Sequence, residues 1–331
     1  MLPTFCDVQA AAVRIAPHAV RTPLVESAVL NALTGGRIFL KLETMQRTGS
    51  FKFRGACNRL AMIPEGDRAR GVVAFSSGNH AQGVAAAASL FAMPAVIVMP
   101  KDAPRPKIEG TRAYGATIVE YDRVREDREA IAAAICAERG AVLVKPFDDG
   151  GIIAGQGTVG LEIAAALRHL RITLDDVLVP CSGGGLVSGI ALALSGSGVS
   201  AAVHSVEPEN FDGMRRSLEA GKRVEAPGGK LSIADALMAP IPGKIVFEVA
   251  KHLLAPGFAV SDAQLEWAVI FAAEKLKLLV EPGGAAALAA LLAGKLDAKG
   301  KTIALVLSGA NADFAAIAGM IDRHGASADT S

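Results

Sequence analysis

The chain has 331 residues, of which 51% are hydrophobic and 20% are charged, so it can bury a large interior. The chain is longer than a typical domain with a single hydrophobic core, so its length predicts two lobes. The 34 basic and 33 acidic side chains give a net charge of +1. That balance excludes the basic surface that nucleic acid or an anionic membrane requires. The apolar stretches are short and rich in alanine, so we expect no membrane span.

The cysteines show no paired spacing. Cys6, Cys57, Cys136 and Cys181 lie far apart, and no signal peptide precedes the first predicted helix. This pattern favours free thiols in a reducing compartment, so we expect a cytoplasmic protein.

Short β-branched runs alternate with helical stretches along the whole chain, which predicts parallel sheets flanked by helices in an α/β fold. The predicted strands are Arg37–Leu42, Gly71–Phe75, Ala95–Met99, Ala116–Tyr121, Val142–Lys145, Asp176–Val179, Ala202–Val206 and Thr302–Leu307. We expect residues 71–148 to form a small domain that carries a substrate loop. Residues 1–70 and 149–331 would then form a large cofactor-binding domain.

The first candidate site residue is Lys52, which lies between Phe51 and Phe53 in the segment Thr48–Gly55. Burial lowers the pKa of an ammonium, and a neutral amine is a nucleophile that can form a Schiff base. The alternative is a lysine that extends its stem along a half-buried helix and keeps its charge in water.

A polar loop follows the strand that ends at Phe75. Its residues Ser76, Ser77, Gly78, Asn79 and His80 combine hydroxyls, an amide and the backbone N–H groups of a helix start. Such a loop can bind an anion, and a substrate carboxylate suits it. An ordinary helix N-cap is the alternative, although a cap needs only one such residue.

A triple-glycine loop stands between the strand ending at Val179 and the next predicted helix. Gly183, Gly184, Gly185 and Leu186 let backbone N–H groups converge, which predicts a phosphate site without arginine. The loop lacks the lysine of a Walker motif, so a small monophosphate suits it better than a nucleotide. A tight strand-to-helix turn is the alternative. Ser308 ends the last predicted strand, where sites of α/β proteins gather.

Together these motifs resemble the serine/threonine dehydratase family of pyridoxal-phosphate enzymes, of fold type II, which includes threonine ammonia-lyase, hydroxyaspartate dehydratase and serine racemase. The resemblance runs from Arg21–Leu24 to Ser308 and also includes Gln46–Lys52, Ser77–His80 and Ala154–Thr158. It implies pyridoxal 5'-phosphate as the cofactor.

The resemblance implies roles for individual residues. Lys52 would form the Schiff base and move the α-proton, Phe51 would pack beside the cofactor, Asn79 would bind the ring hydroxyl, the glycine loop with Leu186 would bind the phosphate, and Ser308 would face the pyridine nitrogen. Glu281 would lie near the ring, with a structural role as an equal alternative. Ser77 occupies the position of a second proton donor in serine racemase.

The implied reaction is β-elimination of water from L-threonine or L-serine, which yields a 2-oxo acid and ammonia. A serine hydroxyl cannot protonate pyridine as a carboxylic acid can, and a weaker electron sink favours elimination over transamination. The alternatives are a 3-hydroxyaspartate dehydratase, a serine racemase-like activity and, more remotely, a non-catalytic amino-acid-binding protein. Arg128 would bind the distal carboxylate of hydroxyaspartate, unless it is a solvated helix arginine.

A divalent cation is the least supported part of the resemblance. Glu207 and Asp212 are present as candidate ligands, but Gly213 stands where the family places another carboxylate. By analogy with the family, we expect a homo-oligomer, either a dimer or a tetramer.

Overall fold

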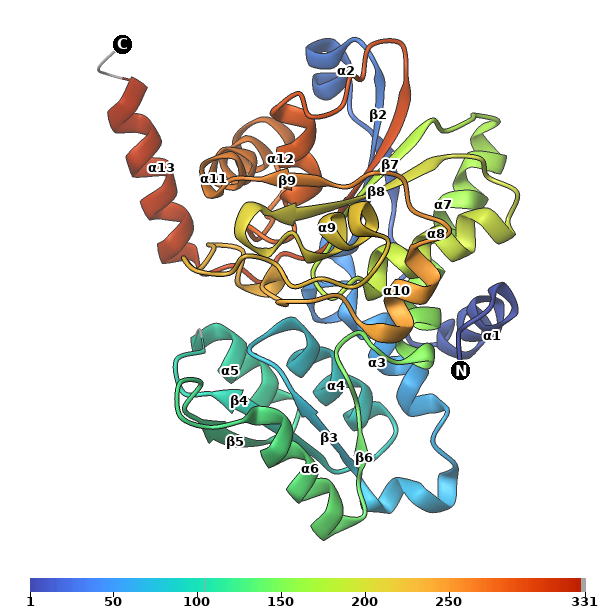
Figure 1. The fold of residues 1–331 in the computed structure, drawn as a ribbon, viewed down its shortest axis with the longest axis vertical. Helices are drawn as coiled ribbons and strands as arrows, with labels where there is room; N and C mark the ends of the chain where they lie inside the picture. The colour runs from blue at the N-terminus through green and yellow to red at the C-terminus, as the bar shows by residue number, and fades with distance from the viewer. Residues whose placement is uncertain (104, 329–331) are drawn as a thin grey trace.

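The computed structural model describes residues 1–103 and 105–328 and contains two sheets, each of which lies at the centre of its own lobe (Figure 1). The six-stranded sheet has the order β1-β2-β10-β7-β8-β9, and the four-stranded sheet has the order β5-β4-β3-β6. Only β1 is antiparallel to its neighbour among the described pairs. The predicted α/β fold with parallel sheets is confirmed.

Every predicted strand is present. The large lobe contains β1 (Leu24–Glu26), β2 (Arg37–Leu42), β7 (Asp176–Pro180), β8 (Ala202–Pro208), β9 (Phe258–Val260) and β10 (Thr302–Leu307). The small lobe contains β3 (Val72–Phe75), β4 (Ala95–Pro100), β5 (Thr117–Tyr121) and β6 (Val142–Leu143). The sequence pattern did not predict β1 and β9, which are edge strands of three residues each.

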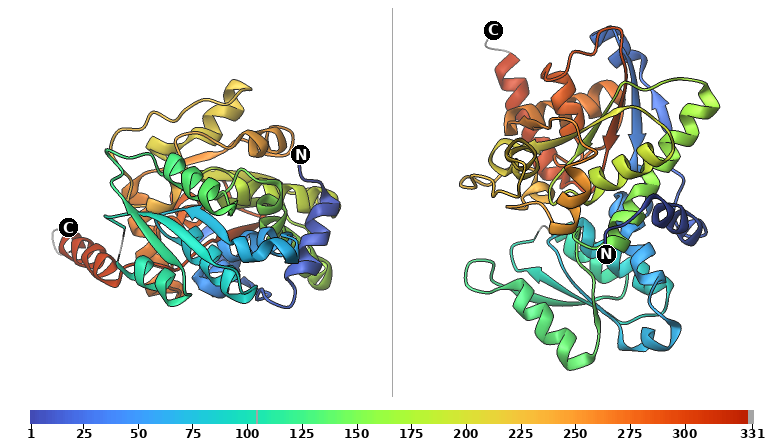
Figure 2. Two further views of the ribbon diagram at one scale, coloured as in Figure 1. Left: turned by 90° about the horizontal axis from the view of Figure 1, so that it is seen from below. Right: turned by 45° about the vertical axis from the view of Figure 1, so that its right-hand side comes forward.

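Helices cover both faces of each sheet (Figures 1 and 2). In the small lobe, α4 (Asn79–Leu90) and α5 (Arg105–Ala113) pack on one face and α6 (Arg128–Arg139) packs on the other. The large lobe carries α1 (Phe5–Ile15), α2 (Ala28–Thr34), α7 (Gly150–Leu170), α8 (Gly185–Gly196), α9 (Gly213–Ala220), α10 (Lys244–Ala250), α11 (Asp262–Phe271), α12 (Ala286–Leu292) and α13 (Phe314–Ala328).

One helix contacts both lobes. The helix α3 (Lys52–Ala61) packs against α4 of the small lobe and α7 of the large lobe. Its apolar side chains Phe53, Ala56, Cys57 and Leu60 belong to the same core as the inner face of the four-stranded sheet. The strands of that sheet all lie between residues 72 and 143, which supports a small domain over residues 71–148. That division remains a prediction, because α3 precedes it and still shares its core.

Buried charges hold the other side of α3. Arg54 contacts Glu43 at 2.7 Å and Glu162 of α7 at 2.7 Å, and Lys41 of β2 lies beside the same two carboxylates. Arg54 and Glu43 are fully enclosed, so each charge depends on its partners. This network fixes α3 against the large lobe close to Lys52.

The long helix α7 is the one described helix that is long and apolar enough to cross a membrane. However, 67% of this stretch is buried, and the helix packs against α1, α3 and α8. The helix α7 is therefore packed as a helix in the core of the large lobe.

Candidate active site

A cavity lies where the end of β7, the start of α3 and the end of β10 meet. We call it the glycine-loop cavity. Every residue predicted to bind the cofactor lines it: Phe51, Lys52, Asn79, Gly183, Gly184, Gly185, Leu186, Glu281 and Ser308. These residues come from segments far apart in sequence, and parallel strands that end at the same edge bring them together.

Lys52 is the first residue of α3, and its ammonium lies within this cavity. Its Nζ donates a hydrogen bond to the carbonyl of Pro146 at 3.1 Å and lies 5.1 Å from the ring centroid of Phe51. Burial lowers the pKa of Lys52 to about 8, although the nearby Glu281 carboxylate favours the charged form. The structure therefore favours the buried amine over the solvated-lysine alternative.

The glycine loop turns sharply from β7 into α8. Gly184 has φ +92°, a left-handed conformation that a glycine adopts without strain. A Cβ on this residue would lie 2.5 Å from Cε of Met214, so a larger residue also lacks space. Among the described residues no side chain caps the α8 N-terminus, and its N–H groups line the cavity through Gly185 and Leu186. An anion is the natural partner of these N–H groups.

A second cavity, of about 250 Å³, adjoins the first, and we call it the serine-loop cavity. The residues predicted to bind substrate line it: Ser76, Ser77, Gly78, Asn79, His80 and Arg128. Lys52 and Asn79 line both cavities. The buried amine thus stands at the boundary between a candidate phosphate site and a candidate carboxylate site.

The serine loop begins where β3 ends. Ser76 Oγ accepts the N–H of Gly78 at 3.1 Å, which shapes the turn, and Ser77 lines the cavity. His80 lies in the first turn of α4, with Nε2 3.0 Å from the carbonyl of Val144. Burial and the charge of Lys52 lower the pKa of His80 to about 3, so the ring is neutral at physiological pH. A neutral His80 ring can orient a ligand by hydrogen bonding, but it cannot form an ion pair with a substrate carboxylate.

Asn79 joins the serine loop to the cofactor side of the site. Its Nδ2 donates to Glu281, and its Oδ1 accepts from Asn311 at 2.9 Å. One amide hydrogen of Asn79 therefore remains for a ligand. Burial raises the pKa of Glu281 above its ordinary value, while Lys107 opposes this rise.

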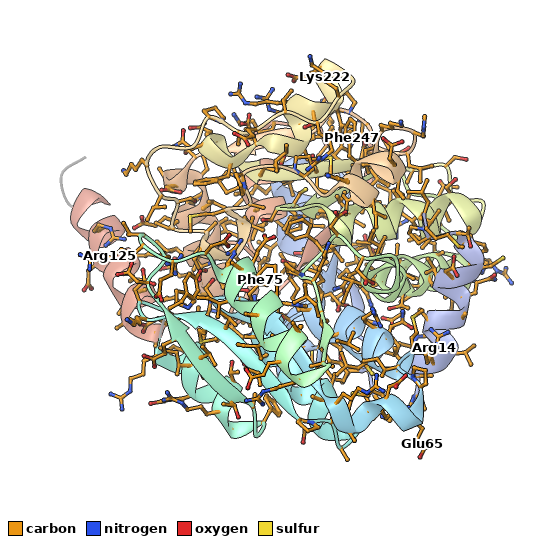
Figure 3. The ribbon with its side chains drawn as sticks, turned by 60° about the horizontal axis from the view of Figure 1, so that its bottom comes forward. Arg14, Glu65, Phe75, Arg125, Lys222 and Phe247 are labelled. Atoms are coloured by element: carbon orange, nitrogen blue, oxygen red, sulfur yellow. The ribbon has the colours of Figure 1, made fainter. Side chains whose placement is uncertain are left out.

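Arg128 begins α6 and is exposed, yet it reaches the serine-loop cavity. Its guanidinium lies 5.2 Å from the ring centroid of Phe75, a buried residue labelled near the middle of the molecule in Figure 3. Arg125, labelled at the periphery of the same view, does not line this cavity. No sequence pattern selected Arg123, which also lines this cavity.

The comparisons with known proteins agree with this geometry. Residues 15–309 match the family described as "Pyridoxal-phosphate dependent enzyme". The chain belongs to this family. Its cofactor is pyridoxal phosphate, and the predicted resemblance and fold type are confirmed.

The relatives include ammonia-lyases. The enzyme is 44% identical to L-threonine ammonia-lyase of Thermotoga maritima over 92% of its own length and 73% of that protein. It is 41% identical to L-threo-3-hydroxyaspartate ammonia-lyase of a Pseudomonas species over 97% of its own length and 99% of that protein. The crystal structure of maize serine racemase matches with a TM-score of 0.90, 36% identity and 98% coverage of both chains. These relatives confirm the predicted class of enzyme, a lyase.

The residues of the glycine-loop cavity fit pyridoxal phosphate. The uncapped N-terminus of α8 suits a phosphate, and Lys52 offers an amine to an aldehyde. Gln156, which lies in the Ala154–Thr158 segment of the resemblance but was given no role there, lines the same cavity and is buried. Its Nε2 finds no hydrogen-bond partner in the described part of the chain. An unpaired buried amide is costly unless a ligand satisfies it.

The residues at the candidate cation site do not fit a divalent cation. Both oxygens of Glu207 accept backbone N–H groups, from Met214 at 2.9 Å and from Arg215 at 2.8 Å. Asp212 forms ion pairs with Arg215 and Arg216. Within residues 1–103 and 105–328 no three metal-binding side chains come together. We derive no step through a metal.

Proposed function

We propose that this enzyme is an ammonia-lyase that eliminates water from L-threonine and L-serine. The observation that carries the proposal is the position of Lys52, whose amine lies between the glycine loop and the serine loop. The 44% identity to an L-threonine ammonia-lyase supports it. A non-catalytic binding protein would have no use for a buried amine with a pKa of about 8.

Bound pyridoxal phosphate supplies an aldehyde for amines and a ring that draws electrons from the α-carbon of the substrate. Lys52 would hold this aldehyde through its amine. Because its pKa is lowered, a substantial share of the free amine is neutral near pH 8, where it can accept a proton from the α-carbon. Gly183, Gly184 and Gly185 hold the phosphate.

The serine loop holds the substrate carboxylate through its hydroxyls and the N–H groups at the start of α4. Phe51 would pack beside the cofactor, and Asn79 would offer its remaining amide hydrogen to the ring hydroxyl. Ser308 presents a hydroxyl where a stronger acid would favour transamination, so loss of the β-hydroxyl is the preferred outcome. The enamine that is released after elimination tautomerises to an imine, which water hydrolyses to a 2-oxo acid and ammonia.

L-threo-3-hydroxyaspartate is the second candidate substrate. Arg123 and Arg128 line the serine-loop cavity, where a distal carboxylate would bind. Because Arg123 Nε already donates to Asp102 at 2.8 Å, Arg128 is the better candidate for this carboxylate. The Pseudomonas hydroxyaspartate ammonia-lyase, at 41% identity, supports this candidate. Ser77 is the residue through which a serine racemase-like side activity would act.

We further propose a cytoplasmic homo-oligomer, a dimer or a tetramer. The free cysteines support a reducing compartment. Sedimentation of the purified protein gives the number of subunits.

A substrate panel tests the function. Ammonia and 2-oxo acid release are measured with L-threonine, L-serine and L-threo-3-hydroxyaspartate, for the wild type and for Lys52→Ala. We expect release with the wild type and a loss of at least about a thousandfold in kcat for Lys52→Ala. The absence of ammonia with every hydroxyamino acid, or a Lys52→Ala variant that keeps the activity, would overturn the proposal.

A further inference from the structure

Lys107 is a buried cation that crosses from the small lobe to the large lobe. It projects from α5, and only 4% of it is exposed. Its Nζ donates to Oδ2 of Asp235 at 2.7 Å and lies 3.5 Å from Oε2 of Glu281. Both carboxylates belong to the large lobe, so one side chain joins the two lobes at the site.

The stem of Lys107 also supports the serine loop. A Cβ built on Gly78 would lie 2.7 Å from Cδ of Lys107, closer than real Cβ contacts. Gly78 therefore provides the space through which Lys107 reaches the large lobe. Lys107 lines the serine-loop cavity as well.

The charge of Lys107 acts on Glu281. Burial raises the pKa of the Glu281 carboxyl, Asp235 raises it further, and Lys107 lowers it. Lys52, at the start of α3, also interacts electrostatically with Glu281. The Oε1 of Glu281 accepts the hydrogen bond from Asn79.

Burial opposes the charge of Lys107 itself. Glu281 and Asp235 outweigh this effect and raise the pKa of Lys107 above its ordinary value. Lys107 therefore stays charged at physiological pH. An ionised Glu281 is the stronger acceptor, so it fixes the amide of Asn79 more firmly than a neutral one does.

We propose that Lys107 is a positioning residue that keeps Glu281 ionised and thereby orients Asn79 toward the cofactor while joining the two lobes. This inference rests on the proposed function of the site. Lys107 acts through Glu281 and Asn79 and need not touch the substrate.

The test compares Lys107→Met, which keeps the stem and removes the charge, with Lys107→Arg, which keeps the charge. Lys101→Met is the matched control, because Lys101 is an exposed lysine of the same lobe. The first readout is the visible absorbance of the bound cofactor as a function of pH, without substrate. The second is the pH profile of kcat.

We expect Lys107→Met to lower kcat by about tenfold and to move the acidic limb of the profile, and the midpoint of the absorbance titration, upward by about one pH unit. Without the cation the Glu281 carboxyl takes up a proton at higher pH, which gives the direction of the shift. Lys107→Arg should keep kcat and both pH midpoints close to their wild-type values. Lys101→Met should change none of them. In a Glu281→Gln background, Lys107→Met should cause no further shift, because the titrating group is gone.

An unchanged titration midpoint in Lys107→Met, or the same shift in the Glu281→Gln background, would overturn the proposal. A lower melting temperature alone, with no change in either pH profile, would leave Lys107 with a purely structural role and would overturn it too. The titration needs no substrate, so it tests Lys107 even when the wild type releases no ammonia and the proposed function has failed.

Discussion

The backbone N–H of Phe51 donates to the carbonyl of Ser308 at 3.1 Å. The residue before Lys52 is thus attached to the end of the last strand, and the neighbouring bridge between Ser50 and Gly309 extends the same contact. Lys52 and Ser308, predicted for opposite sides of one cofactor, are therefore held at a fixed separation by the backbone.

The first prediction concerns the stability of the apoenzyme. Lys52→Met should raise its melting temperature by about 5 °C at neutral pH, because the wild type buries a charge there. The folded chain holds this ammonium with a pKa of about 8, against the ordinary value of 10.5. Between these values the unfolded chain binds the extra proton, so the stability of the wild type increases as the pH rises. Calorimetry across this range should show the advantage of the variant shrinking, and a constant advantage would contradict the assignment.

The second prediction concerns the glycine loop. Gly184→Ala should weaken the binding of pyridoxal phosphate by at least about tenfold, because the left-handed φ and the contact with Met214 both displace the loop. Gly198→Ala is the matched control, since Gly198 has φ +73° and open space around its Cβ position. Cofactor titration of both apoenzymes separates the effects. Equal losses of affinity would mean that backbone strain alone, and not the phosphate loop, is responsible.

Arg128 provides the third prediction. Arg128→Ala should lower kcat/KM for L-threo-3-hydroxyaspartate by about tenfold to a hundredfold and leave L-threonine turnover nearly unchanged, because only the former has a distal carboxylate. Arg125→Ala should affect neither substrate, since Arg125 lies outside the serine-loop cavity. If hydroxyaspartate turnover survives in Arg128→Ala, the distal-carboxylate site is wrong.

Chelation gives the fourth prediction. Dialysis against a chelator should change neither the activity nor the melting temperature, because Glu207 is already satisfied by two backbone N–H groups and Asp212 by two arginines. We would measure the activity and the melting temperature before and after dialysis, each with and without added Mg²⁺. A loss that Mg²⁺ restores would contradict our interpretation of these carboxylates.

The sequence predicted much of the site because its motifs are local. Lys52, the serine loop and the glycine loop each stand at a strand-to-helix junction, and parallel strands bring such junctions to one edge. Their individual roles remain predictions. The strands β1 and β9 were missed because three residues are too short to show a periodic pattern.

Long-range electrostatic partners were the other omission. Lys107 and Asp235 are 128 residues apart, and no local pattern pairs them. In the sequence Arg123 resembles any charged residue of an exposed turn, and only the fold shows that it lines the same cavity as Arg128. Such contacts depend on how the two lobes meet, and no local pattern contains that information.

The packing of α3 between α4 and α7 has a consequence for the reactive lysine. One face of the helix belongs to the core of the small lobe through Phe53, and the other is paired with carboxylates of the large lobe through Arg54. Lys52 begins this helix, so the position of its amine depends on how both lobes pack. A substitution that loosens either face of α3 would therefore displace the amine without touching the residues that line the cavity.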